Sequence, residues 1–205
     1  MKFLDFHKTF SPLGCFDINQ IRAWDNTIDR TTIDRWVNDG LLIRLRNGLF
    51  AFNDWTERAG SEFVAANKVC RPSYVSLYSA LSYYGMIPEF VAQTTSVTTV
   101  KTMTFNTPVG TFSFRHIKPP YFFGYQPIVT SAGQSAMFAS PEKALLDLLY
   151  LEPSLKTADD MAQLRIDDDF LHEKFDLPAA KDIIAHLDNN ALTQRFSIFL
   201  KAYNL

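Results

Sequence analysis

The chain has 205 residues, 47% hydrophobic and 14% aromatic, so it can bury a sizeable core. Its formal net charge of −2 provides no bulk attraction for a polyanion. The two cysteines, Cys15 and Cys70, form no CxxC pair, which predicts neither a zinc site nor a disulfide framework. No stretch approaches the ~18 apolar residues of a membrane-spanning helix. The polar residues Asp5, His7 and Lys8 interrupt the N-terminus, so we expect a cytoplasmic protein without a signal peptide.

Residues 2–10 can form a short supporting helix with its phenylalanines on one side. Residues 16–52 then predict two short helices, a tight turn and a β-hairpin. Asp17 is placed to cap the first helix, and Gln20 stands at the capping-box position three residues later. Asp29 follows turn-forming residues and can cap the second helix.

The second helix is amphipathic. Ile33, Trp36 and Val37 fall at helical spacing and should face the core, and Gly40 ends the helix. The opposite, polar face carries the following side chains: Arg30, Thr31, Asp34, Arg35 and Asn38.

A hairpin follows, because Leu41–Leu45 and Leu49–Phe52 flank Asn47-Gly48, a strong hairpin signal. Two arginines, Arg44 and Arg46, lie on it. This order predicts a winged helix-turn-helix, in which the second helix enters a DNA major groove and the hairpin arginines contact the backbone. An ordinary helical bundle with a solvated polar face is the alternative.

Bulk charge does not favour DNA, since residues 1–58 hold eight Lys/Arg and eight Asp/Glu. Affinity would have to come from the placement of charge, or from pairing of two copies on DNA.

The remainder predicts an α+β domain. Residues 57–70 and 73–85 have helical patterns. The stretch from 93 to 117 is rich in Thr, Val and Phe and alternates as strands do. Further strands are expected within 121–130 and 135–139, giving a small, mostly antiparallel sheet.

The clearest signal of the second half is the helix start at residues 140–147, SPEKALLD. Ser140 is a good N-cap, and a proline suits the first helical position. Lys143 and Asp147 stand four residues apart and predict a surface ion pair. Residues 158–205 hold five Lys/Arg and nine Asp/Glu, and predict an acidic, helical C-terminal part.

Two of these features in this order, the winged helix-turn-helix ending in RLRNGLF (44–50) and the SPEKALLD stretch (140–147), resemble the AbiEi-type antitoxins of type IV toxin–antitoxin systems. Those proteins are transcriptional regulators in abortive infection, a form of phage (viral) defence. The resemblance covers roughly residues 10–155, and the SPEKALLD stretch is its specific part.

The resemblance implies a DNA-binding domain at 1–56 and an antitoxin-like domain at 57–205. It implies a regulator that represses its own operon by binding repeats in the promoter, and that counteracts a neighbouring nucleotidyltransferase-like toxin, with direct contact between the two left open. The polar helix face and the hairpin are then the expected DNA-binding set: Arg30, Thr31, Asp34, Arg35, Asn38, Arg44, Arg46 and Asn47. The sequence departs from the family pattern by its acidic residues in and beside this helix.

Parts of the sequence are also compatible with other functions. The polar residues of a strand and a helix, among them His116, Glu142 and Lys143, could suggest a nuclease or nucleotide site. No HExxH, P-loop or GxSxG motif is present, so we expect no catalytic activity, no metal and no cofactor. A one-component regulator sensing a small molecule in the second domain is the stronger alternative, since aromatic residues at 73–84 and 121–125 could line a pocket. A pure protein-interaction module is the third.

Overall fold

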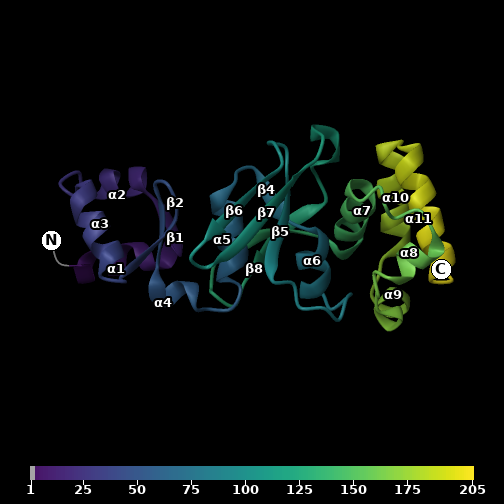
Figure 1. Ribbon diagram of the computed structural model, residues 1–205, viewed down its shortest axis with the longest axis horizontal. Coiled ribbons are helices and arrows are strands. Elements are labelled where there is room, and N and C mark those ends of the chain that lie inside the picture. Colours follow the sequence, from purple (N-terminus) through teal and green to yellow (C-terminus); the bar gives the residue numbers. More distant parts are fainter. Residues whose placement is uncertain (1–2) are drawn as a thin grey trace.

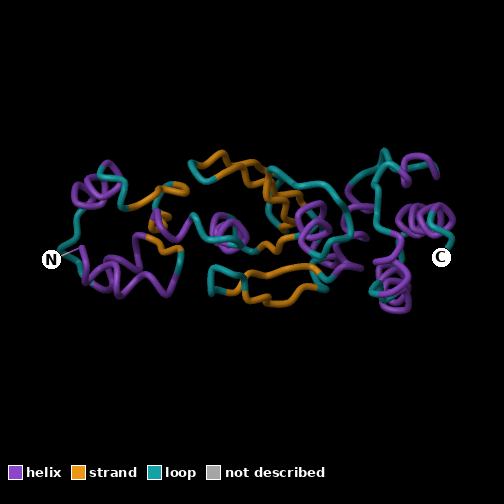
Figure 2. The backbone as a smooth tube through the Cα atoms, turned by 90° about the horizontal axis from the view of Figure 1, so that it is seen from below, coloured by secondary structure: helices purple, strands orange, loops and turns teal. Residues whose placement is uncertain are grey.

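The computed structural model describes residues 3–205 and confirms the α+β class. The molecule is elongated (Figure 1). An N-terminal group of helices with a small sheet lies at one end, a larger sheet lies in the middle, and the C-terminal helices lie at the other end. Figure 2 shows the same order in the perpendicular view. No helix within residues 3–205 has the length and apolarity needed to cross a bilayer.

The N-terminal group places three helices around a three-stranded antiparallel sheet of order β1-β3-β2. Its core is aromatic, and the Phe6 ring lies 4.7 Å from Trp36 and 5.6 Å from Phe52 between ring centroids. The elements are α1 (Phe3–Phe10), β1 (Cys15–Asp17), α2 (Ile18–Trp24), α3 (Arg30–Asn38), β2 (Leu42–Arg46) and β3 (Leu49–Phe52).

Local chemistry places these helices as predicted. The Asp17 carboxylate accepts hydrogen bonds from the Asn19 and Gln20 amides, and the Gln20 side chain accepts from the Asp17 amide, which completes the capping box. Asp29 accepts from the Thr32 amide at 2.8 Å and caps α3.

The middle of the molecule is a six-stranded mixed sheet of order β6-β7-β5-β4-β9-β8. Neighbouring strands are antiparallel in three pairs and parallel in the other two, β5 with β7 and β4 with β9. Helices α5 and α6 pack against this sheet. The elements are α4 (Asn53–Thr56), α5 (Ser61–Val69), β4 (Ser73–Val75), α6 (Leu77–Tyr83), β5 (Gln93–Thr98), β6 (Met103–Thr107), β7 (Gly110–His116), β8 (Tyr125–Val129) and β9 (Ser135–Ala139).

The expected helix over residues 73–85 was wrong in its first part. Ser73–Val75 form strand β4, and only Leu77–Tyr83 form a helix. The strand pairs with β5 on one side and β9 on the other, so its backbone hydrogen bonds depend on segments far along the chain. These partners override the local helical pattern.

Helix α7 separates the sheet from the C-terminal helices (Figure 1). The Ser140 hydroxyl accepts from the Lys143 amide, so the predicted N-cap is confirmed. The C-terminal part packs on α7 and is part of the folded body. The elements are α7 (Pro141–Leu151), α8 (Ala158–Ala162), α9 (Asp168–Glu173), α10 (Leu177–Leu187) and α11 (Asn190–Ala202).

Trp55 of α4 joins the N-terminal group to the larger sheet. Its indole Nε1 donates to the Gln134 side chain at 2.7 Å, and its ring lies against Gly14. A Cβ atom at Gly14 would lie 2.6 Å from the ring, and its φ of +67° also favours glycine. Gln134 in turn donates to the Pro12 carbonyl. The junction is therefore a packed contact.

Candidate functional site

The polar face of α3 is the first candidate site. Ile33 and Trp36 are buried on one side of the helix. The other side presents exposed polar residues along its length: Arg30, Thr31, Arg35 and Asn38. Arg30 leaves 82% of its side chain in solvent. The Asp29 cap fixes the first turn of α3, where this face begins.

Asp34 lies on the same face and has two basic neighbours. Its carboxylate pairs with Arg44 on the hairpin, and it lies 3.6 Å from Arg30 on its own helix. Arg44 also lies over the Phe50 ring, 5.5 Å from the centroid. The structure thus brings together three of the predicted DNA-binding residues, and Asp34 offsets part of their positive charge.

Arg46, the second hairpin arginine, turns toward the larger part of the molecule. Its Nη1 donates to the Val69 carbonyl at 2.5 Å. Asn47 is exposed at the hairpin turn. A cleft of about 280 Å³ beside them is also lined by Lys68 and Arg71, which the sequence interpretation missed. They are distant from the hairpin in sequence and reach it only through the fold.

A second group of polar residues lies inside the molecule. The Lys143 ammonium donates to the Asp147 carboxylate and to the Tyr74 hydroxyl. Tyr74 and Ser76 both donate to the other oxygen of Asp147, at 2.9 and 2.8 Å. The expected surface pair was therefore wrong in its placement, because both side chains are at most 2% exposed.

Burial dominates the electrostatics of this cluster. It raises the pKa of the Asp147 carboxyl, against the lowering effects of Lys143, Ser76 and Tyr74. Burial, helped by the neighbouring Asp147, also raises the pKa of the Tyr74 hydroxyl. Each polar group has a partner within the cluster, and Gly124 packs on the Lys143 side chain. This arrangement ties α7 to β4.

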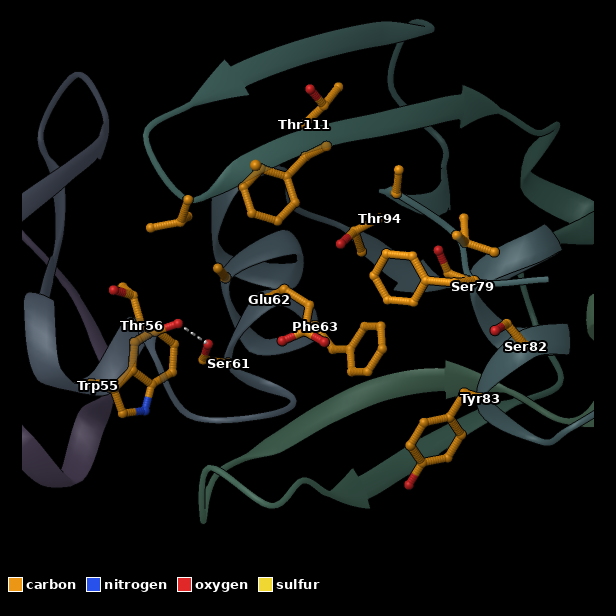
Figure 3. A pocket seen from close by; sticks show the side chains of 17 residues that line it. Trp55, Thr56, Ser61, Glu62, Phe63, Ser79, Ser82, Tyr83, Thr94 and Thr111 are labelled. Atoms are coloured by element: carbon orange, nitrogen blue, oxygen red, sulfur yellow. Dashed lines mark hydrogen bonds between the residues drawn. The ribbon is translucent and has the colours of Figure 1, made fainter. Parts of the chain in front are cut away.

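The third feature is a cavity of about 300 Å³ between the sheet, α4, α5 and α6 (Figure 3). Its walls combine aromatic rings with hydroxyl groups and include Trp55, the residue at the junction. Of the residues proposed above for a nuclease-like site, none lines it.

No group of three or more His, Cys, Asp or Glu side chains within residues 3–205 is arranged to hold a metal ion. The sequence matches no protein-family model and no curated protein.

Proposed function

We propose that the chain is a DNA-binding transcriptional regulator in which residues 1–56 act as a winged helix-turn-helix. Helix α3 would enter the major groove and the β2–β3 hairpin would lie beside it as the wing. The observation that carries the proposal is the amphipathic α3, which buries Ile33 and Trp36 and offers Arg30, Thr31, Arg35 and Asn38 to solvent next to a hairpin.

The chemistry of this face suits duplex DNA. Arginine reads guanine through two parallel hydrogen bonds, asparagine reads adenine in the same way, and threonine serves either a base edge or a phosphate. Within residues 3–205, Arg35 forms no ion pair and is exposed, so it is the first choice for a base contact. Arg44 would bind a DNA phosphate after giving up its ion pair with Asp34.

We extend the proposal to the biological role that the family resemblance implies. The chain would repress its own operon and act as the antitoxin of a type IV toxin–antitoxin system, with residues 57–205 counteracting a nucleotidyltransferase-like toxin. The support for this part is the order of the predicted motifs, with the SPEKALLD stretch at the start of α7.

A reporter fused to the promoter of the protein's own gene tests the regulatory half. Expression of the chain should lower the reporter signal, and the variant Arg30→Ala/Arg35→Ala should restore it at equal protein level. A growth assay with the adjacent toxin gene tests the antitoxin half. In this assay the wild-type chain and the Arg30→Ala/Arg35→Ala variant should both rescue growth. Equal repression by the wild-type chain and the double variant would contradict the role of α3.

A further inference from the structure

The cavity in Figure 3 has one carboxylate among its aromatic and hydroxyl-bearing walls. Of the 17 residues that line it within the described part of the chain, only Glu62 carries a charge. Glu62 lies in the first turn of α5, where a carboxylate complements the helix dipole. That position accounts for a carboxylate on α5, but not for the ring-lined cavity around it. Within residues 3–205, Glu62 forms no ion pair and no side-chain hydrogen bond, so its carboxylate can accept bonds from a ligand.

A second polar side chain that has no partner in residues 3–205 lies in the same cavity. Thr94 of β5 lines the cavity and is only 8% exposed, yet its hydroxyl makes no hydrogen bond within the described residues. The other β5 threonine nearby, Thr95, is bonded to Ser76 and Ser79. The Thr94 hydroxyl is not sealed from solvent, so it is accessible to a polar group bound in the cavity and can donate or accept a hydrogen bond.

The remaining walls are largely aromatic. Phe63 of α5 and Tyr83 of α6 meet edge to face at 5.8 Å between centroids, and Phe112 of β7 completes the wall on the sheet side. Figure 3 shows Glu62, Phe63 and Thr94 around the same hollow. Aromatic faces attract organic cations, and they also bind an apolar body.

We propose that this cavity binds a small organic ammonium compound. The ammonium group pairs with the Glu62 carboxylate, the aromatic rings hold its apolar body, and the Thr94 hydroxyl bonds to a second polar group where the ligand has one. The cavity volume of about 300 Å³ lies at the lower end of the range for small-molecule sites. Trp55 and Thr56 also line it, so the ligand would sit at the junction with the N-terminal group.

The test is a calorimetric titration of the full chain with three probes of similar shape: phenethylamine, 2-phenylethanol and 3-phenylpropanoate. They present a positive, a neutral and a negative group on the same ring. Phenethylamine should bind about tenfold or more tightly than 2-phenylethanol, because the alcohol can still donate a hydrogen bond to Glu62 but has no positive charge to pair with the carboxylate. The propanoate should bind least.

The variant Glu62→Gln should lose about tenfold or more of the phenethylamine affinity and with it the preference for the amine. Glu57→Gln is the matched control, since Glu57 is exposed and does not line the cavity. Equal binding of the three probes, absence of phenethylamine binding at millimolar concentration, or an amine preference that survives Glu62→Gln would each overturn the proposal. These readouts are independent of DNA binding.

Discussion

Lys143 holds its ammonium group inside the protein, between Asp147 and Tyr74. Removing two opposite charges from water is unfavourable, and only close pairing with further hydrogen bonds compensates for it. Ser76 and Tyr74 provide those bonds to Asp147, and the Tyr74 and Phe123 rings lie beside the ammonium at 5.5 and 5.3 Å. The cluster is therefore sensitive to the loss of any one member.

Lys143→Met should lower the free energy of unfolding by about 3–5 kcal/mol, because it leaves the Asp147 carboxylate buried without its cation. The double variant Lys143→Met/Asp147→Leu should recover part of the loss, since both charges are then absent. Urea unfolding followed by circular dichroism measures both. Lys181→Met is the control, since Lys181 is exposed on α10. Equal stability of the two single Lys variants would refute the account of the cluster.

The two cysteines should be unreactive in the folded chain. Burial raises the pKa of the Cys15 thiol to about 12, so at pH 8 it is almost entirely protonated and a poor nucleophile. Cys70 is 4% exposed. Iodoacetamide at pH 8 should therefore modify neither cysteine in the native chain and both in urea, as read by mass spectrometry. Rapid labelling of Cys15 without denaturant would show that its surroundings open.

At the scale of elements, α3 carries the proposed reading of DNA. Arg35→Ala should weaken binding to the operator by about 1–3 kcal/mol, the value of a two-bond contact with guanine. Fluorescence anisotropy with promoter DNA measures the change. Arg165→Ala is a matched control, because Arg165 is an exposed arginine near the opposite end of the molecule. An unchanged affinity for Arg35→Ala would remove it from the base-reading set.

Asp34 should lower the affinity of the same α3 surface for DNA. Asp34→Ala removes a negative charge and releases Arg44 and Arg30 from their pairs. We expect tighter binding to duplex DNA of any sequence, and a salt dependence steeper by about one phosphate contact. Anisotropy titrations at several salt concentrations give both values. Weaker binding with an unchanged slope would mean that Asp34 orients the arginines for contact with DNA.

Helix starts could be predicted because their causes are local. Asp17, Asp29 and Ser140 each cap a helix with an amide two or three residues away. The hairpin strands at Leu42–Arg46 and Leu49–Phe52 follow from the Asn47-Gly48 turn in the same way. Strand β4 could not be predicted, because its three residues are extended only through pairing with β5 and β9.

The candidate sites were predictable to a smaller extent. Spacing predicted that Lys143 and Asp147 would pair, but the burial of the pair depends on Tyr74, which lies 73 residues before Asp147. Lys68 and Arg71 reach the hairpin through tertiary contact alone. The cavity was indicated only in part. The aromatic stretch at 73–84 supplies Tyr83 to its wall, whereas the residues at 121–125 do not line it. The other walls come from segments between Trp55 and Phe112 that are separated along the chain.

At the scale of the whole molecule, the N-terminal group and the sheet share a packed junction through Trp55 and Gln134. Residues 57–205 nevertheless contribute most of the buried hydrophobic side chains, including Val64, Leu145 and Phe199. A chain starting at residue 57 should therefore lose repression of the promoter reporter and keep any neutralisation of the toxin in the growth assay. Loss of both activities in a soluble, folded fragment would mean that the two parts function only together.

The most direct test of the central claim is a gel-shift titration of the full chain against the DNA just upstream of its own gene, with unrelated duplex in excess as competitor. The account predicts a complex that survives the competitor and weakens steadily as the salt concentration rises. A complex that the competitor removes would contradict it. The N-terminal helices and hairpin would then be a scaffold, and the function of the chain would have to be sought in a protein partner of residues 57–205.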